Sequence, residues 1–336
     1  MSFLIRLSSK VLKWLVRFKF SKVSLFYNIV FENAQKSLFD LSIVNDIPSS
    51  YLGAIEDYAP NDFYGHATIY KKYCGFPVVF PIRATIQHAA FFGNYMWNQD
   101  LIHFKKSICW GENYKNVLIS HGKESCHVVG APFIYEDSFF DIHELDKLKS
   151  EFKKTLLVFP SHSTHYVDCD YDLIEFTNWI VSTRDSNGFD TVLVCMYWKD
   201  ILKGTHLEYI KSGFKVVTAG HIFDINFTAR LKSIFILSDA FVSNKIGSYV
   251  GYGLSLGKPF KLFDGDVKLS GDSEGNREMG IFLEDESYIL LKSLCRDSDL
   301  FHVNEKVVAI VEKYWGRLKP LSKGDLRKII ENCFQD

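Results

Sequence analysis

Residues 234–264 read IFILSDAFVSNKIGSYVGYGLSLGKPFKLFD, and they place a glycine-rich amphipathic segment between two short apolar ones. The apolar segments at 240–243 and 259–264 predict buried strands, and the segment between them predicts a helix. Strand, helix and strand in this order are typical of a parallel sheet. A polar pair, Ser243 and Asn244, stands where the first of these strands ends.

The same alternation of strand and helix extends upstream to residue 155. Further strands are expected at 155–161, 191–198 and 214–220, and helices at 171–185, 201–213 and 225–238. Short apolar strands that alternate with helices of this length predict a doubly wound parallel sheet. We therefore expect a Rossmann-like domain at residues 151–300.

A second and less regular α/β unit precedes this domain. Its expected elements are strands within 77–90, at 107–111 and at 126–132, and a helix at 115–122. The charged segment 136–154 is expected to link this unit, residues 31–150, to the next one. Helices at 303–316 and 322–334 are expected to close the chain as a final segment, residues 301–336. The sequence thus predicts an α/β protein with two Rossmann-like domains.

The composition is that of a globular protein. The chain has 336 residues, of which 47% are hydrophobic and 24% are charged, enough for two domains with their own cores. Its formal net charge of −1 lacks the basic field of a nucleic-acid-binding protein, so no nucleic-acid partner is expected. The seven cysteines are scattered without a C-x-x-C pair, which predicts neither a zinc site nor a disulfide framework and fits the cytoplasm.

The first 31 residues contain basic side chains and no acidic ones. Arg6, Lys10, Lys13 and Arg17 form a narrow stripe at helical spacing, while Leu, Val, Trp and Phe side chains gather opposite. We expect residues 1–30 to form an amphipathic segment that binds an anionic membrane surface through residues 3–20. The alternative is a helix packed on the protein body with solvated lysines. Charged residues interrupt the apolar positions of this segment, and no other segment is apolar enough to span a bilayer. We therefore expect a peripheral protein on the cytoplasmic membrane.

Small polar and imidazole side chains follow several of the predicted strands. The candidates are Ser161, His162, Ser163, His221, Ser243 and Asn244, with Gly247 and Ser248 opening the next helix. Ligands of open α/β sheets bind beyond the carboxyl ends of the strands, and helix-start amides with hydroxyls suit phosphate oxygens. The alternative is that Ser243-Asn244 caps the helix and that the glycines permit close packing.

Other nucleotide and hydrolase fingerprints are missing. The chain contains no G-x-x-x-x-G-K-[ST] and no G-x-S-x-G. The D-C-D at 168–170 is expected to be the start of the helix at 171 rather than a metal-binding motif. We therefore expect no metal and no bound cofactor.

Candidates for a general base lie in the first unit. His88 follows a predicted strand, and His66 and Asp57 lie upstream of it. An imidazole or carboxylate can accept the proton of a hydroxyl group. We take His88 as the first candidate, with Asp57 and His66 in reserve and Glu112 as a further carboxylate.

The order of several segments resembles a known family. These segments are IQHAA, ICWGENYKNVLISHG, HVVGAPFIY, LVFPSHSTHY and VVTAGHIFDINFTARLKSIFILSDAFVSNKIGSYVGYGLSLGKPF. Together they resemble the bacterial GT-B glycosyltransferases of surface polysaccharide synthesis, in outline the Kdo and sialic acid transferases and more distantly the polyol-phosphate transferases. The resemblance covers residues 55–265 and is most specific at 218–259. The usual Q-H-G appears here as Gln87-His88-Ala89.

The resemblance implies a GT-B fold, with two Rossmann-like domains that face a cleft. It implies a nucleotide-sugar donor bound by the second domain, with His221 and Arg230 near the residues named above. It also implies transfer without a metal to a lipid-linked or lipopolysaccharide or capsule saccharide, with a CMP-linked acidic sugar preferred as donor. Two alternatives are a GT-B-fold sugar-nucleotide epimerase and a non-catalytic polysaccharide assembly protein.

Overall fold

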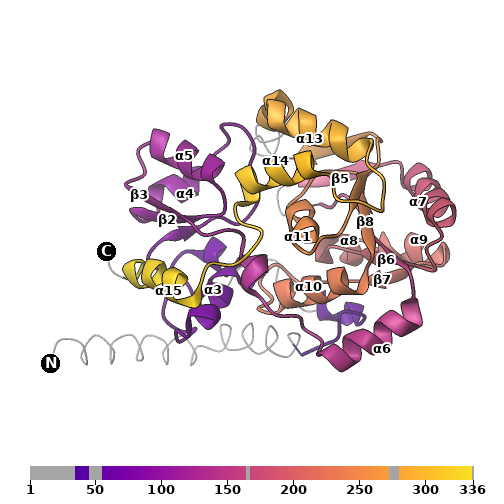
Figure 1. Ribbon diagram of the computed structural model, residues 1–336, viewed down its shortest axis with the longest axis horizontal. Coiled ribbons are helices and arrows are strands. Elements are labelled where there is room, and N and C mark those ends of the chain that lie inside the picture. The colour runs from indigo at the N-terminus through magenta and orange to yellow at the C-terminus, as the bar shows by residue number, and fades with distance from the viewer. Residues whose placement is uncertain (1–34, 45–54, 164–166, 272–279, 335–336) are drawn as a thin grey trace.

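A computed structural model describes residues 35–44, 55–163, 167–271 and 280–334. The amphipathic segment expected at residues 1–30 lies outside these residues. The described chain contains two parallel sheets surrounded by helices (Figure 1). This confirms the prediction of an α/β fold with two Rossmann-like units. None of the described helices is long and apolar enough to cross a membrane.

The first sheet has three parallel strands in the order β1-β2-β3. Its elements are η2 (Ala59–Gly65), α3 (His66–Cys74), β1 (Thr85–Ile86), α4 (Asn98–Ile102), β2 (Lys106–Cys109), α5 (Glu112–Ser120), β3 (Ser125–Val128) and η3 (Pro132–Tyr135). The short helix η1 (Leu41–Val44) precedes them in the sequence but packs on the second half. Within the predicted strand region 77–90 only β1 is a strand, because Pro77 and Pro81 cannot donate ladder hydrogen bonds.

The second sheet has five parallel strands in the order β7-β6-β4-β8-β9. Its elements are β4 (Thr155–Phe159), α7 (Leu173–Asn187), β6 (Thr191–Cys195), α8 (Trp198–Leu202), α9 (His206–Lys211), β7 (Lys215–Val217), α10 (Phe227–Leu237), β8 (Ala240–Ser243), α11 (Tyr249–Ser255) and β9 (Phe260–Leu262). All five predicted strands of this half are confirmed; β8 has the predicted bounds, and the other four are shorter than expected. The helix predicted at 201–213 is wrong as a single element, because Gly204, with φ +83°, separates α8 from α9.

The central strands β6, β4 and β8 of the second sheet are buried on both faces, which explains their apolar runs. Along β4, Leu157 and Phe159 join a core cluster with α10 and α11, while Leu156 and Val158 join another with α7 and α9. Side chains of a strand alternate between the two faces, so helices must cover both of them. The sheet is therefore doubly wound, as predicted.

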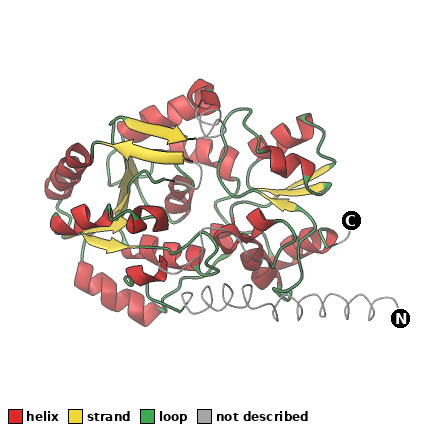
Figure 2. Ribbon diagram, turned by 180° about the vertical axis from the view of Figure 1, so that it is seen from behind, coloured by secondary structure: helices red, strands yellow, loops and turns green. Residues whose placement is uncertain are grey.

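A two-stranded antiparallel sheet lies beside this half, as Figure 2 shows from behind. It pairs β5 (Val167–Tyr171) with β10 (Val267–Gly271). The prediction that residues 168–170 begin a helix is therefore wrong, since these residues pair with Ser270, Leu269 and Lys268. The cap of α7 is Asp172, whose side chain accepts a hydrogen bond from the Glu175 amide.

The segment expected to be a linker contains a helix, α6 (Ile142–Phe152), which connects the two sheets. A capping box between Asp141 and Glu144 starts this helix. Leu145 and Phe152 are buried, and α6 packs against α10. The segment does connect the two halves, but as a packed helix rather than as an open linker.

The chain ends with α13 (Glu286–Arg296), α14 (Glu305–Trp315) and α15 (Lys323–Asn332). The two helices predicted at 303–316 and 322–334 are confirmed as α14 and α15. α14 contacts α11 of the second half and α5 of the first, and α15 packs against α3 (Figure 1). The end of the chain thus returns to the first half and ties the two halves together.

Two glycines of α11 explain why this helix has so few large side chains. A Cβ atom on Gly253 would lie 2.3 Å from the Phe241 ring on β8, and one on Gly251 would lie 2.4 Å from the Trp315 ring. Both distances are shorter than carbon atoms tolerate, so α11 approaches the sheet and α14 only because these positions lack side chains.

Candidate functional site

The carboxyl ends of two neighbouring strands, β4 and β8, are joined by a side chain. The Oδ1 atom of Asn244 accepts a hydrogen bond of 2.7 Å from the Ser161 amide. The same side chain is 5% exposed, and its Nδ2 group has no hydrogen-bond partner among the described residues. A buried donor without a partner carries a free-energy cost of about 1–3 kcal/mol, which a bound acceptor would remove.

Two basic side chains lie near this amide. The imidazole of His162 packs on the Tyr197 ring, with 4.3 Å between ring centroids. Burial lowers the pKa of His162, and the positive charge of Lys245, the residue after Asn244, adds to this effect. Sequence reasoning missed Lys245, although it directly follows Ser243-Asn244. The signal was a lysine next to a predicted phosphate-binding turn.

The turn from Ser243 to Ser248 is held by its own hydrogen bonds. The Ser243 hydroxyl lies 2.7 Å from the Tyr249 hydroxyl and accepts a bond of 3.1 Å from the Lys245 amide. Gly247 precedes Ser248, and α11 starts only at Tyr249. Ser243 therefore shapes the turn, and the Nδ2 group of Asn244 is a donor of the turn that has no partner among the described residues.

Ser248 connects this turn to the first half of the chain. Its hydroxyl oxygen accepts a hydrogen bond of 3.2 Å from the Ala90 amide, two residues beyond His88. Its carbonyl oxygen accepts a bond of 2.8 Å from the Trp315 indole. The loop after β1, which carries His88, therefore lies against the turn after β8. The fold brings together candidates that are 155 positions or more apart in the sequence.

His88 is partly buried among aromatic rings. Its ring centroid lies 4.4 Å from that of Trp97 and 5.8 Å from that of Phe63. Burial lowers the pKa of His88 to about 3, and its Nδ1 atom has no partner among the described residues. The imidazole is neutral near pH 7, so one ring nitrogen is able to accept a proton.

The two reserve candidates differ from each other. His66 begins α3, is fully buried beside Tyr64 and Trp110, and has a pKa lowered to about 3 by burial and by the charge of His88. Asp57 is exposed and pairs with Arg83, with 3.6 Å between Oδ2 and Nε. His66 and His88 thus both pack among aromatic rings of the first half, whereas Asp57 pairs with Arg83 at the surface.

Aromatic rings connect the imidazoles of the two halves. The Phe63 ring lies between His88 and Phe223, at centroid distances of 5.8 and 5.3 Å, and Phe223 lies 5.7 Å from His221. The Tyr64 amide donates a bond of 2.6 Å to the carbonyl oxygen of Ile222. Residues 63–64 of the first half therefore pack directly on the loop after β7.

His221 and Arg230 are held inside this loop. The Nδ1 atom of His221 accepts a bond of 3.3 Å from the Phe223 amide, so its proton is on Nε2. The Arg230 side chain is 0% exposed and donates to the Asp224 carboxylate at 2.8 Å and to the carbonyl oxygen of Ala219 at 3.3 Å. These contacts support a role for Arg230 in positioning the loop rather than in touching a donor.

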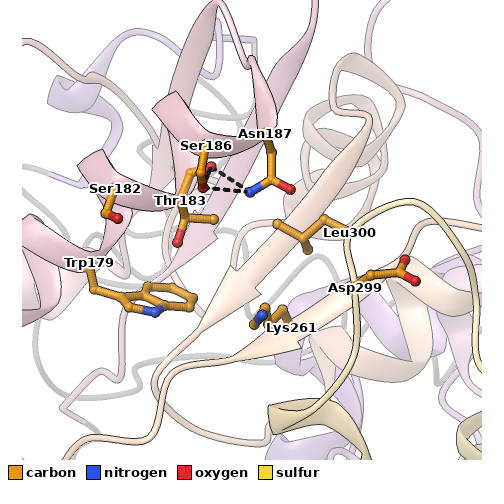
Figure 3. A pocket seen from close by; sticks show the side chains of 8 residues that line it. All are labelled: Trp179, Ser182, Thr183, Ser186, Asn187, Lys261, Asp299 and Leu300. Atoms are coloured by element: carbon orange, nitrogen blue, oxygen red, sulfur yellow. Dashed lines mark hydrogen bonds between the residues drawn. The ribbon is translucent and has the colours of Figure 1, made fainter.

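A surface pocket lies away from this site (Figure 3). Trp179 and Asn187 of α7, Lys261 of β9 and Leu300 line it. The carbonyl oxygen of Asn187 accepts a bond of 2.7 Å from Lys154, which directly precedes β4. The pocket is therefore at the amino ends of the strands, whereas the candidate site is at their carboxyl ends.

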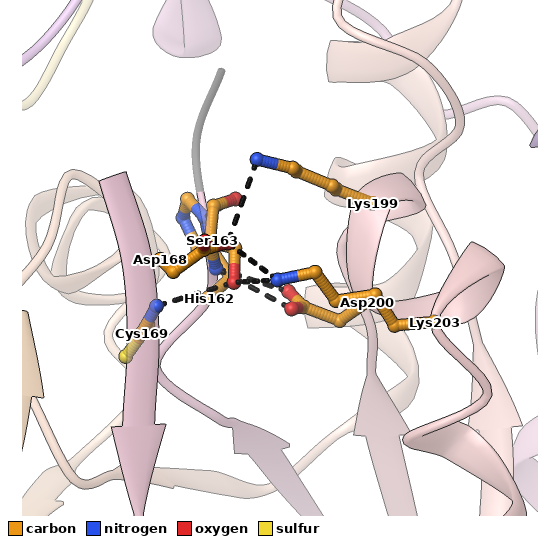
Figure 4. Close-up of polar contacts among 7 residues, drawn as sticks. All are labelled: His162, Ser163, Asp168, Cys169, Lys199, Asp200 and Lys203. Carbon is orange, nitrogen blue, oxygen red and sulfur yellow. Dashed lines mark hydrogen bonds and ion pairs between the residues drawn. The ribbon is translucent and has the colours of Figure 1, made fainter. Parts of the chain in front are cut away.

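Asp200 of α8 is a second residue that sequence reasoning missed. Its carboxylate accepts the Ser163 amide, with 3.2 Å to Oδ2 and 3.4 Å to Oδ1 (Figure 4). Ser163 is fully buried, and its hydroxyl oxygen also accepts a bond of 3.1 Å from Lys203. The sequence shows no motif around Asp200, so only the fold reveals it.

Nowhere in the described part of the chain do three His, Cys, Asp or Glu side chains lie together as metal ligands would.

No protein-family model and no curated protein matches the chain, but solved structures are similar to it. A variant of the wall teichoic acid polymerase TagF has 12% identity and a TM-score of 0.46, covering 76% of this chain and 68% of that chain. A putative UDP-N-acetylglucosamine 2-epimerase from Listeria monocytogenes has 10% identity and a TM-score of 0.40, with 75% and 65% covered. The UDP-GlcNAc 2-epimerase from Neisseria meningitidis, bound to UDP-GlcNAc, has 13% identity and a TM-score of 0.34, with 69% and 68% covered. Likenesses at this level assign neither an activity nor a residue role to this chain.

Proposed function

We propose that the chain is a GT-B glycosyltransferase that uses a nucleotide-activated sugar. The observation that carries this proposal is the meeting of two strand ends from different halves. On one side are Asn244, Lys245 and His162, and on the other is His88, joined through the bond between Ser248 and Ala90. An anion-binding corner opposite a neutral imidazole is what sugar transfer from a nucleotide requires.

The phosphate of the donor would bind at the corner between β4 and β8. The free Nδ2 group of Asn244 would donate a hydrogen bond to a phosphate oxygen, and Lys245 would supply positive charge. Ser161, Ser163, Ser243, Gly247 and Ser248 would shape this corner, while His221 and Arg230 would hold the loop beside it. Charge that develops on the leaving phosphate is stabilised by such fixed donors, without a metal.

The acceptor hydroxyl would bind near His88. A neutral imidazole accepts the hydroxyl proton as the bond to the sugar forms, and His88 has the lowered pKa that keeps it neutral. His66 and Asp57 stay in reserve as bases. His66 is the preferred reserve, because its imidazole is neutral near pH 7 whereas Asp57 pairs with Arg83.

The finer features of the reaction rest on the sequence. They are a CMP-linked acidic sugar as donor, a lipid-linked or lipopolysaccharide or capsule saccharide as acceptor, and a peripheral position on the cytoplasmic membrane. The basic stripe within residues 3–20 supports the membrane surface as a partner.

A sugar-nucleotide epimerase is the second candidate. The observation that favours it is the presence of two neutral imidazoles, His66 and His88, close enough for the charge of one to lower the pKa of the other. Two such groups are able to exchange protons with one bound sugar nucleotide without any acceptor.

A panel of CMP, CDP, UDP, GDP and dTDP tests the proposal by thermal shift. We expect one nucleotide to raise the melting temperature, because a ligand that binds only the native state stabilises it. The corresponding radiolabelled nucleotide sugar is then incubated with and without a membrane lipid extract. Label in the lipid fraction supports the transferase, and conversion of the sugar nucleotide without lipid supports the epimerase. If no nucleotide raises the melting temperature, both are contradicted and a non-catalytic assembly protein is favoured.

A further inference from the structure

A buried carboxylate binds the backbone amide that directly follows His162. Asp200 is 7% exposed, and both of its oxygens face the amide of Ser163, the residue after His162 (Figure 4). Burial disfavours the ionised form of Asp200 and therefore raises the pKa of its carboxyl group. The charge of His162 opposes this effect, so the two side chains act on each other.

The hydrogen bond of His162 determines which ring nitrogen carries the proton. Its Nδ1 atom lies 3.3 Å from the carbonyl oxygen of Ser163. A carbonyl oxygen only accepts, so Nδ1 carries the proton and the neutral ring has a lone pair on Nε2. A lone pair repels a phosphate oxygen. The ring is able to donate a hydrogen bond from Nε2 only after it takes up a second proton.

The charges around this pair come from several elements. Lys245, in the turn after β8, disfavours the protonated imidazole, while Asp200 favours it. Lys203, directly after α8, favours the ionised form of Asp200. Cys169 and Tyr171 on β5, Tyr197 before α8 and Tyr209 on α9 also lie near Asp200. Without a ligand, burial dominates and His162 is neutral.

We propose that His162 takes up a proton on Nε2 when a nucleotide phosphate binds, and that Asp200 is the positioning residue that stabilises the resulting imidazolium. This inference rests on the proposed function. The proton comes from the solvent, and the imidazolium then lies between two anions, the carboxylate and the phosphate. Charge-assisted hydrogen bonds of this kind are stronger than neutral ones.

Nucleotide affinity should therefore depend on pH. Each mole of bound nucleotide takes up about one mole of protons, so the affinity falls by up to about tenfold per pH unit as the pH rises above neutrality. Asp200 shifts the pH range over which the affinity changes, because its carboxylate stabilises the imidazolium of His162.

Calorimetry with the stabilising nucleotide measures the proton uptake. Titrations near neutral pH in buffers with different ionisation heats give the number of protons bound. We expect uptake in the wild type, a reduced value in Asp200→Asn and none in His162→Gln. Asp168→Asn is the matched control, because Asp168 is an exposed carboxylate of the same cluster and pairs with Lys203 at 2.5 Å without bonding the Ser163 amide. Its proton uptake should equal that of the wild type.

A titration without ligand separates this inference from the proposed function. In NMR spectra of the protein with ¹³C-labelled histidine, the His162 signal is assigned as the one missing in His162→Gln. We expect Asp200→Asn to lower the pH at which this signal titrates, and Asp168→Asn to leave it unchanged. If the midpoint is the same in Asp200→Asn, the inference is overturned even when nucleotide binds. If the wild type binds nucleotide without proton uptake, the inference also fails while the proposed function stands.

Discussion

At the scale of single residues, His88 illustrates how burial prepares a side chain for chemistry. Aromatic rings remove water from the imidazole and lower its pKa to about 3, while its Nδ1 atom has no partner among the described residues. A solvated histidine is partly protonated near neutral pH, whereas His88 is unprotonated there, and the same lowered pKa makes its imidazole a weaker base. The rings of Phe63 and Trp97 therefore matter as much as the imidazole itself.

Replacing the candidate base should separate transfer from binding. We expect His88→Gln to lower kcat for sugar transfer by about 10²–10⁴-fold, the usual contribution of a general base, with little change in nucleotide Kd. The exposed His143 of α6 provides the control variant His143→Gln, which should keep full activity. Full activity in His88→Gln would show that His88 is not the general base, and His66 would then be the next candidate.

Asp100 makes the stability of the first half depend on pH. It is 1% exposed and accepts bonds from the hydroxyls of Tyr58, at 2.9 Å, and Tyr114, at 2.7 Å. Burial is the largest effect and raises its pKa to about 6. A raised folded-state pKa means that the contribution of Asp100 to stability is complete below the unfolded value of about 4 and is lost as the pH rises through about 6.

The variant Asp100→Asn should lose this dependence. Between about pH 5 and pH 7 we expect the free energy of unfolding of the wild type to fall by about 1 kcal/mol more than that of the variant. Urea unfolding at the two pH values measures this difference. The exposed carboxylate of Asp297 gives the control Asp297→Asn, which should follow the wild type. Equal pH dependence in wild type and Asp100→Asn would show that Asp100 does not titrate in this range.

Sequence reasoning predicted some site residues and missed others for a physical reason. Ser161, His162 and Asn244 were proposed from the sequence because they lie at the ends of apolar strands, and strand ends have a recognisable pattern. Asp200 was missed because its partner, Ser163, is 37 positions away. Arg230 was grouped with the ligand contacts because a sequence does not show that Asp224 already neutralises it.

At the scale of secondary structure, α11 shows why a helix of low intrinsic propensity follows strand β8. Glycine lowers helix stability by about 1 kcal/mol relative to alanine. Here it permits a close approach to β8, because a Cβ atom on Gly253 would lie 2.3 Å from the Phe241 ring and 2.8 Å from the Phe235 ring. Packing therefore outweighs helix propensity in this element.

A pair of alanine variants tests this balance. Gly253→Ala gains helix propensity but overpacks the core, so we expect a net destabilisation of about 1–3 kcal/mol. Gly324→Ala in α15 is the matched control, since its Cβ atom would meet only the Ser322 hydroxyl at 4.0 Å. That variant should be neutral or slightly more stable. Chemical denaturation measures both, and a stabilised Gly253→Ala would contradict the packing argument.

The sequence predicted the long periodic elements well and the short or polar ones poorly. The strands of the second sheet are continuous apolar runs and were all found. The pair β5–β10 was missed, because the stretch VDCDY at 167–171 is dominated by aspartates that do not read as a strand. The helix α6 was read as a linker for its charge, although its apolar positions Leu145 and Phe152 follow a helical period.

At the scale of the whole molecule, the two halves share one core. A single cluster of buried apolar side chains includes Trp110 of the first half, Phe235 of the second and Trp315 at the end of α14. The rings of Phe133 and Tyr252 stack across the same region at 4.6 Å. The sequence predicted two units and did not reveal this shared core, because its contacts join segments that are more than 100 positions apart. We infer that this core holds the loop of His88 against the turn of Asn244.

The central claim is that the corner between β4 and β8 binds the phosphate of a nucleotide. Calorimetric titration of the wild type and Asn244→Asp, with the stabilising nucleotide and with its nucleoside, tests it most directly. The Asp variant keeps the oxygen that accepts the Ser161 amide and replaces the free Nδ2 donor by a negative oxygen. Asn304→Asp, which adds the same charge at the cap of α14, is the control.

We predict that the wild type and Asn304→Asp bind the nucleotide at least about tenfold more tightly than the nucleoside, a difference of about 1.4 kcal/mol. In Asn244→Asp this preference should disappear without loss of the folded state. An unchanged preference for the nucleotide in Asn244→Asp would contradict the account.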